Sequence, residues 1–392
     1  MRQHPTSTKG YSHAPTPTQD TPELLLHNLN CSRIVSHDMV FVDTSFGPND
    51  TTLGKGLVER CTSLQWRRAH EILPSAQPGQ GLFHGIDPTD IAQGQLGDCW
   101  LLSSISSLAE FPEVVKYSFV TKDTNLEGKY VVRIYDPKLA AASHRTTIGA
   151  PKAGKQEWIE ITVDDYLPCS NGKPAFAAAP GGDFWVCILE KAYAKYVGSY
   201  EKLSGGFPAL AFQCMTGCKS TVFMFDEQVA REVTFGETSL KDIAAGKRGT
   251  TAHATGNVQD ANQLWESVKR FDELDYLMVL ASKGTDEYTE TGADTGDWGL
   301  VGGHAYSLIR AVKVGRFRMC RIRNPWGDFE WGGDWSDRSP LWKKHPEVKA
   351  ACNPILDKDD GIFWMCFEDV LKLFMSLTVC QLQREGESKA ES

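Results

Sequence analysis

Residues 93–102, Gln-Gly-Gln-Leu-Gly-Asp-Cys-Trp-Leu-Leu, are the most informative part of the sequence. They lead into a run in which apolar residues at 101, 102, 105, 108 and 111 repeat with helical spacing, and Pro112 ends this run. Asp98, directly before Cys99, is a favourable N-cap residue. The sequence therefore predicts a helix from Cys99 to Phe111 with Cys99 as its first residue.

Cys99 is the strongest candidate for chemistry because of this position at a helix start. Unpaired backbone N–H groups and the helix dipole favour a thiolate there, and the thiolate is the nucleophilic form of cysteine. Gln93, six residues earlier, could join the Cys99 backbone N–H as an oxyanion hole. The alternatives are that Cys99 is one more small buried thiol and that Gln93 is a solvated loop residue.

A base and an orienting group for such a thiol are found far along the chain. His304 begins a predicted strand, residues 313–315 look like a turn, and Asn324 ends the next strand. Because residue 314 is the midpoint between them, a hairpin would place His304 opposite Asn324. The Asn324 carbonyl could then orient the imidazole, and Trp326 could shield the bond from water. The alternatives are a satisfied strand histidine and a plain strand-ending turn.

Composition excludes several classes of protein. The 392 residues carry 41 Lys and Arg against 50 Asp and Glu, a formal charge of −9, without a long basic run, which argues against nucleic-acid binding. The sequence contains no run of 18 apolar residues, so it predicts no membrane span. The eleven cysteines are scattered and odd in number, which indicates a reducing compartment. We therefore expect a cytoplasmic protein.

The chain divides into two halves that differ in predicted secondary structure, with a boundary at Ser204-Gly-Gly. The first half predicts helices at 99–111 and 184–196 and short strands at 129–135 and 158–163. The second half predicts strands at 276–281, 304–313, 316–323 and 361–367. We expect an α+β fold with four parts: a disordered tail at 1–30, a helical subdomain at 45–205, a β-rich subdomain at 206–380 and a polar tail at 384–392.

From about Trp66 to Phe374 these segments resemble the calpains, which are papain-like cysteine proteases. The motifs that carry the resemblance are Gln93 to Leu102, Gly303-His-Ala-Tyr-Ser, Arg321-Ile-Arg-Asn-Pro-Trp-Gly, Leu189-Glu-Lys-Ala-Tyr-Ala-Lys, Leu203-Ser-Gly-Gly and Asp360-Gly-Ile-Phe-Trp-Met. The resemblance implies a papain-like protease core with two subdomains and the active site in the cleft between them. It also implies limited cleavage of intracellular proteins as the activity.

The resemblance assigns a role to each matching residue. Cys99 is implied as the nucleophile, His304 as the general base and then acid, and Asn324 as the orienting residue. Gln93 supplies an oxyanion donor. The implied groove residues are Gly205, Gly206, Gly303 and Trp326.

Calcium is the cofactor that the resemblance implies, with one ion in each subdomain. The implied ligands are Asp90, Glu190 and carbonyls from about Phe83 to Gly85 at the first site, and Glu330, Asp337 and Asp360 at the second. Oxygen ligands suit calcium. The sequence departs from the family at Pro88 and Ile362, where an arginine and a glutamate usually link the two sites. We therefore expect calcium to act with less cooperativity than in family members that have both linking residues. The alternative is that these acidic residues are solvated surface charges and bind no calcium.

Two other functions stay open at this point. A catalytically silent calpain-like scaffold would keep the fold without the activity. A transglutaminase-like acyl transferase also uses a Cys-Trp helix start, but it places an aspartate where Asn324 stands. As a calpain-like protease, the chain is expected to have protein substrates as partners. The sequence does not decide whether it also binds a regulatory subunit.

Overall fold

The computed structural model describes residues 40–73, 76–77, 81–142, 157–179, 181–226, 229–235, 239–245, 252–284, 298–356 and 358–382. All of them belong to one compact unit, Met39–Ser392. The predicted tails at 1–30 and 384–392 lie outside the described residues. The predicted subdomain boundary near residue 205 stays a prediction.

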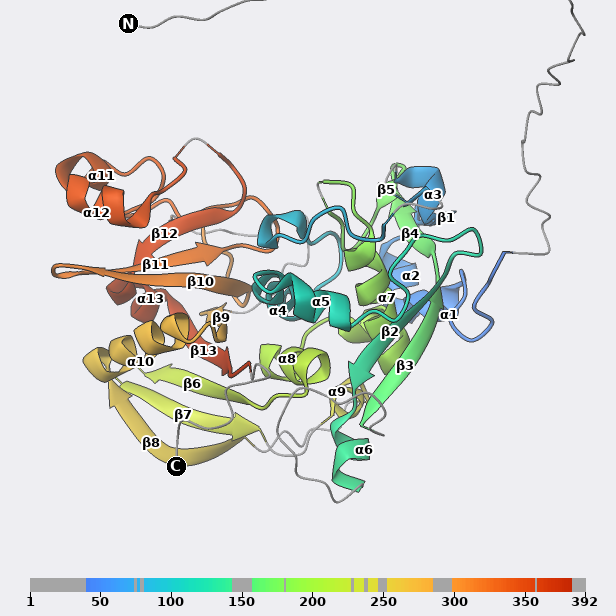
Figure 1. Ribbon diagram of the computed structural model, residues 1–392, viewed down its shortest axis with the longest axis horizontal. Helices are drawn as coiled ribbons and strands as arrows, with labels where there is room; N and C mark the ends of the chain where they lie inside the picture. Colours follow the sequence, from blue (N-terminus) through green and yellow to red (C-terminus); the bar gives the residue numbers. More distant parts are fainter. Residues whose placement is uncertain are drawn as a thin grey trace, which may run out of the picture. The chain divides into compact units, whose positions relative to one another are not determined.

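The first half of the unit consists of short helices and two small antiparallel sheets, ordered β1-β4-β5 and β2-β3 (Figure 1). Its elements are α1 (Asp50–Leu53), α2 (Lys55–Arg60), β1 (Gln65–Arg68), α3 (Ala69–Ile72), η3 (Pro88–Asp90), α4 (Cys99–Ala109), α5 (Pro112–Tyr117), β2 (Lys129–Tyr135), α6 (Pro137–Ala142), β3 (Trp158–Asp164), β4 (Tyr166–Ser170), β5 (Lys173–Pro174), α7 (Trp185–Val197), η4 (Glu201–Leu203) and α8 (Pro208–Thr216). The predicted strands at 129–135 and 158–163 are confirmed as β2 and β3. The predicted helix at 184–196 is α7, shifted by one residue.

The second half is built on one eight-stranded antiparallel sheet with the order β12-β11-β10-β9-β13-β6-β7-β8. Its elements are β6 (Ser220–Asp226), β7 (Val229–Phe235), α9 (Leu240–Ala244), β8 (Ala252–Asp260), α10 (Ala261–Glu273), β9 (Leu277–Ser282), β10 (Ala305–Val314), β11 (Phe317–Arg323), α11 (Leu341–Lys344), α12 (Pro346–Cys352), β12 (Ile362–Cys366), α13 (Phe367–Leu373) and β13 (Phe374–Cys380). Helices α10 and α13 cover the sheet with apolar side chains, and α11 and α12 cover β11 and β12. The α+β class is confirmed.

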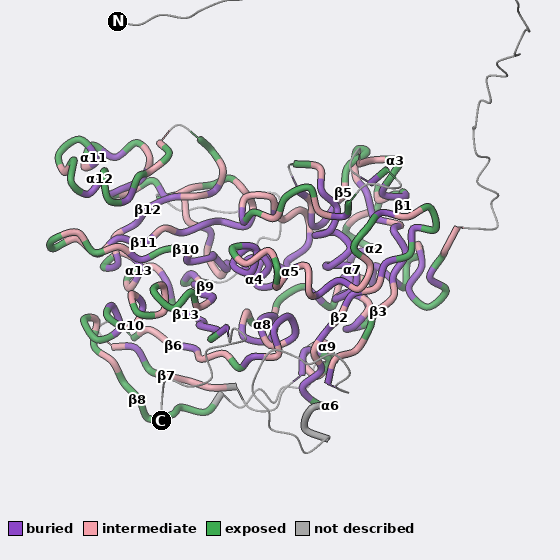
Figure 2. Tube along the Cα trace, viewed as in Figure 1, coloured by how far each residue is buried: buried purple, intermediate pink, exposed green. Residues whose placement is uncertain are grey.

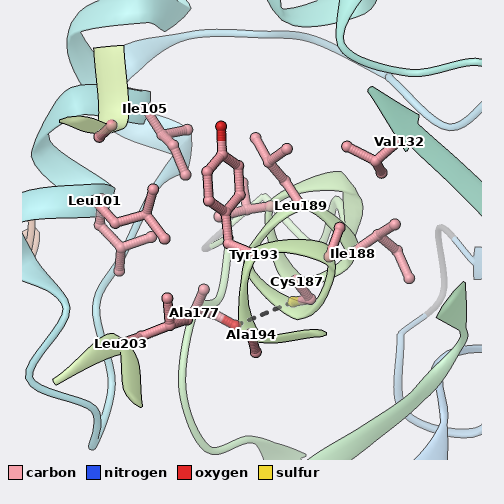
Figure 3. Packing of buried hydrophobic residues seen from close by; sticks show 14 of the residues in the cluster. Leu101, Ile105, Val132, Ala177, Cys187, Ile188, Leu189, Tyr193, Ala194 and Leu203 are labelled. Carbon is pink, nitrogen blue, oxygen red and sulfur yellow. Dashed lines mark hydrogen bonds between the residues drawn. The ribbon is translucent and has the colours of Figure 1, made fainter. Parts of the chain in front are cut away.

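Helix α4 lies between the sheet and α7, and it packs against β9, β10 and α8 (Figure 1). Every residue of α4 is buried, as the purple tube in Figure 2 shows. Leu101 and Ile105 face Leu189 and Tyr193 of α7 in the core drawn in Figure 3. The buried hydroxyl of Ser104 is satisfied within α4, because it donates to the Trp100 carbonyl at 2.8 Å.

Pro112 begins a helix as well as ending one. Helix α4 ends at Ala109, two residues earlier than predicted, and Pro112 is the first residue of α5. Proline is favoured there because the first N–H of a helix has no intrahelical partner.

The hairpin of β10 and β11 forms as predicted, but its register differs. Val314 pairs with Phe317, so Gly315 and Arg316 make the turn, and Ser307 pairs with Arg323. The predicted register is wrong by two residues near His304. The turn lies later than predicted, which shifts the pairing by three residues, and the irregularity between Leu308 and Arg310 takes one residue of this shift back. A shift of two residues keeps each side chain on its face of the sheet.

Candidate active site

Cys99 lies at the start of α4, where the sequence placed it, and its side chain is buried with 7% of its surface exposed. The segment after η4 lies against this helix start. The Gly205 N–H donates to the Gly97 carbonyl at 2.8 Å, and the Trp100 indole N–H donates to the Leu203 carbonyl at 2.8 Å. A Cβ on Gly206 would approach the Trp100 ring to 2.4 Å, so only glycine fits without rearrangement.

Asp98 occupies the N-cap position, but the prediction that its side chain caps α4 is wrong. The backbone carbonyl of Asp98 accepts from the Leu101 and Leu102 N–H groups, and the carboxylate makes no capping hydrogen bond. The side chain is fully buried, and this burial raises the pKa of Asp98 to about 7, while the neighbouring Glu190 lowers it. The Asp98 side chain therefore lies in the interior of the protein near Glu190.

His304 and Asn324 contact each other directly. His304 Nε2 lies 2.9 Å from Asn324 Oδ1, and both residues are buried. The Asn324 amide is oriented by its Nδ2, which donates to the Phe329 carbonyl at 3.1 Å, so Oδ1 faces the imidazole as acceptor. The Nε2 of His304 must then carry the hydrogen of this bond, which leaves Nδ1 to take a proton.

The imidazole is held in a tight and largely apolar setting. The backbone of His304 is fixed by Ser282. The His304 N–H donates to the Ser282 hydroxyl at 2.9 Å, and the His304 carbonyl accepts from the Ser282 N–H at 2.9 Å. The Trp326 and Tyr306 rings each have their centroid 4.9 Å from that of His304. Burial lowers the pKa of His304 to about 4, against the opposing effect of Asn324, so the ring is neutral at neutral pH.

Gln93 links the first half of the chain to the loop after Asn324. Its backbone N–H donates to the Pro325 carbonyl at 2.9 Å, and its Oε1 accepts from the Trp326 indole N–H at 3.0 Å. Its Nε2 donates to the Leu96 carbonyl at 2.6 Å. The next residue must be glycine, because a Cβ on Gly94 would come within 2.3 Å of the Ala175 carbonyl oxygen.

The structure thus joins His304, Asn324, Trp326 and Gln93 in one network of contacts. Cys99 belongs to the same region because α4 packs on β10, and the Ser307 hydroxyl donates to the Ser103 carbonyl at 2.9 Å. Gly303 directly precedes His304 and adopts a φ of 61°, which favours glycine.

The acidic residues of the implied first calcium site are arranged differently from the expectation. Glu190 is buried, accepts from the Ala177 N–H at 2.9 Å and lies beside Asp98. Burial and the charges of Asp87 and Asp183 raise the pKa of Asp90. Asp183 therefore lies near enough to Asp90 for its charge to act there, and Glu190 belongs to the interior.

The acidic residues of the implied second site do lie near one another. Glu330 Oε1 accepts from the Asp360 and Gly361 N–H groups at 3.1 and 3.0 Å. Burial and the charge of Asp337 raise the pKa of Glu330 to about 7. Lys358 pairs with Asp360 at 3.0 Å. Such oxygen donors are of the kind that calcium prefers, although the described residues contain no group of three acidic, histidine or cysteine side chains close enough to hold a metal ion.

Three residues of this region were not singled out from the sequence. Asp183 precedes α7, Ser282 ends β9, and Arg323 ends β11 directly before Asn324. The sequence contained one indication that Arg323 has a specific role. It is a charged residue in a central strand among apolar residues, and such a residue needs a partner when it is buried. Within the described residues, no helix is long and apolar enough to cross a membrane.

Comparisons with known proteins agree with this architecture. The model of the family described as "Calpain family cysteine protease" matches residues 41–381. The chain is 32% identical over 357 residues to the calpain-type cysteine protease DEK1 of Arabidopsis thaliana, covering 88% of this chain and 14% of the plant protein. It is 32% identical over 361 residues to the calpain-1 catalytic subunit of Rattus norvegicus, covering 90% of this chain and 43% of the rat protein.

A third relative, calpain-8 of Mus musculus, is 33% identical over 348 residues, which are 86% of this chain and 41% of the mouse protein. The chain thus spans less than half the length of each of these relatives. The papain-like α+β core expected from the motifs is confirmed. This chain belongs to the calpain family of cysteine proteases.

Proposed function

We propose that this chain is a cysteine endopeptidase in which Cys99 is the nucleophile, His304 the general base and acid, and Asn324 the residue that orients the imidazole. The observation that carries the proposal is the 2.9 Å contact between His304 Nε2 and Asn324 Oδ1. This contact reserves Nδ1 of His304 for proton transfer, and the helix that begins at Cys99 packs on the strand that follows His304.

The chemistry follows from these groups. Nδ1 of His304 takes the proton of the Cys99 thiol, and the sulfur attacks the carbonyl carbon of a peptide bond. The imidazolium returns the proton to the leaving amine as the C–N bond breaks, which leaves a thioester on Cys99. Water, deprotonated by the same imidazole, then attacks the thioester and releases the acid and the thiol. A neutral imidazole at the start of this cycle is consistent with the lowered pKa of His304.

The oxyanion of each tetrahedral intermediate needs hydrogen-bond donors. We assign this role to the Cys99 backbone N–H, at the start of a helix, and to the Gln93 side-chain amide. The second hydrogen of Gln93 Nε2 remains for this purpose, because the first is donated to the Leu96 carbonyl. Trp326 orients the amide through its bond to Oε1 and covers one face of His304.

Calcium modulation is a second part of the proposal. The residues that would hold the ion are Asp90 and Asp183 in the first half, and Glu330, Asp337 and Asp360 in the second. Asp183 takes the place of Glu190 because its charge acts on Asp90, while Glu190 lies beside Asp98. Bound calcium would offset the repulsion between Glu330 and Asp337. With Pro88 and Ile362 in place of a linking pair, we expect weak coupling between the two sites.

The test is cleavage of an unstructured protein by the wild-type chain and by Cys99→Ala. We expect the variant to lose activity by several orders of magnitude while keeping its circular dichroism spectrum. Cys61→Ala, a half-buried cysteine at the end of α2, is the matched control and should cleave normally. Cleavage by Cys99→Ala would refute the assignment, and a folded wild type without cleavage would favour a scaffold. Incorporation of an amine into a glutamine donor would favour acyl transfer.

A separate experiment tests calcium without relying on activity. Thermal unfolding in calcium and in chelator should show a higher melting temperature with calcium, because a ligand that binds the native state stabilises it. Glu330→Gln should reduce this increase, while Glu59→Gln, an exposed acid on α2, should not. An equal melting temperature in calcium and chelator would remove calcium from the proposal.

A further inference from the structure

Arg323 is the last residue of β11, directly before Asn324, and its side chain is fully buried. Burying a guanidinium is costly unless its charge and its donors find partners. Burial lowers the pKa of Arg323 to about 10, and the charges of Asp360, Asp87 and Asp90 oppose this effect. A charged group kept in the interior at this cost calls for a reason in the surrounding structure.

The guanidinium crosses from the large sheet to the first half of the chain. Its Nη2 donates to the Ile91 carbonyl at 2.6 Å, and its Nη1 donates to the Ser106 hydroxyl of α4 at 3.2 Å. The Ser106 hydroxyl in turn donates to the Pro88 carbonyl of η3 at 3.2 Å. One side chain therefore links β11 to the helix α4, to η3 and to the segment that follows η3.

These segments are the ones that carry the proposed catalytic groups. β11 leads directly into Asn324, α4 begins at Cys99, and Ile91 lies two residues before Gln93. The relative position of the three groups depends on how the sheet sits against α4. A planar guanidinium presents its donors in a rigid fork that fixes the direction of each bond, whereas the three donors of an ammonium rotate about a single nitrogen atom and fix the geometry less.

We infer that Arg323 is a positioning residue that holds the His304–Asn324 pair in register with Cys99 and Gln93. This inference rests on the proposed function. Arg323 does not touch the reacting atoms, and it acts through the backbone at Ile91 and through α4. Loss of Arg323 removes the hydrogen bonds that fix β11 against α4 and Ile91. A displacement of the catalytic groups by about 1 Å can lower the rate about 10²-fold.

The experiment compares Arg323→Met, Arg323→Lys and Ser106→Ala with the wild type. We expect kcat to fall about 10²-fold in Arg323→Met with a nearly unchanged KM, and to recover in part in Arg323→Lys. Arg321→Met is the matched control, because Arg321 lies two residues earlier on the same strand face and its charge acts on Glu110 at the end of α4. The control should retain wild-type kcat.

A second readout separates positioning from a purely structural role. The alkylation rate of Cys99 by iodoacetamide, followed by mass spectrometry across pH, reports the pairing of thiol and imidazole without turnover. We expect this pH profile in Arg323→Met to move towards that of an ordinary thiol. A folded Arg323→Met with wild-type kcat and profile would overturn the inference.

If Arg323→Met fails to fold, Arg323→Lys and Ser106→Ala decide the question. A changed profile in either supports the inference, and unchanged profiles in both overturn it. Failure of the proposed function has a different signature, namely cleavage by Cys99→Ala or no cleavage by the wild type. The alkylation profile still tests the positioning role in that case.

Discussion

Replacing Asn324 with alanine tests how the imidazole is oriented. The change removes the acceptor that lies 2.9 Å from His304 Nε2, so the ring loses the partner that fixes its hydrogen on Nε2. During catalysis this bond is made to an imidazolium, and a hydrogen bond to a charged group contributes about 1.5–3 kcal/mol. At about 1.4 kcal/mol for each tenfold change, kcat should fall about 10- to 150-fold.

The same change also reaches the fold. The Phe329 carbonyl loses the Asn324 Nδ2 donor, and the Trp326 N–H loses its 3.1 Å acceptor. Leaving a buried group unpaired costs about 1–3 kcal/mol, and these partly buried groups should cost less, so the melting temperature should fall moderately. Asn324→Asp should keep the bond to the imidazole and move the acidic limb of the pH profile to higher pH, since a carboxylate raises the pKa of His304 and the base must be neutral to take the proton.

The assay is steady-state cleavage of a peptide across pH, with thermal unfolding measured on the same samples. Asn125→Ala, an exposed amide that donates to the Lys129 carbonyl at 3.0 Å, is the control for the loss of an asparagine. A folded Asn324→Ala with wild-type kcat and pH profile would refute the orienting role.

Three further predictions concern the first half of the chain. Lys191→Met leaves the buried Asp164 carboxylate without its cation, so chemical denaturation should show about 3–5 kcal/mol less stability, and an unchanged midpoint would contradict this. Gly206→Ala places a Cβ against Trp100 beside the nucleophile, so stability should drop by about 1–3 kcal/mol and activity should fall with it. Burial raises the pKa of Asp98 to about 7. Between about pH 4 and 7 the native state therefore binds more protons than the unfolded state. In this range stability falls as pH rises, by up to about 1.4 kcal/mol per pH unit. Asp98→Asn should flatten this slope, and an equally steep slope in the variant would exclude Asp98 as its source.

The sequence predicted those features that depend on local pattern. The start of α4 at Cys99 follows from apolar spacing over a few turns, and the contact of His304 with Asn324 follows from two strands joined by a short turn. The fold class also followed, because helical and strand patterns separate along the chain. The family followed from motifs that span most of its length.

The sequence could not predict features that depend on distant segments. Asp98 has an ordinary N-cap sequence, but its carboxylate is drawn into the interior beside Glu190, which lies far along the chain. Asp183 gains its neighbour Asp90 from a distant segment of the first half, and Arg323 gains Ile91 only when the two halves pack together. The hairpin register differed because the turn lies at Gly315 and Arg316, and neither the exact turn position nor a strand irregularity leaves a clear mark in a single sequence.

The most direct test of the account is to identify the residue that carries the acyl group. A slowly turned-over peptide ester would be mixed with the enzyme, quenched in acid and analysed by mass spectrometry after digestion. We expect an acyl group on the peptide that contains Cys99, formed much more slowly in His304→Ala. Product release with the acyl group on another cysteine, or on none, would contradict it.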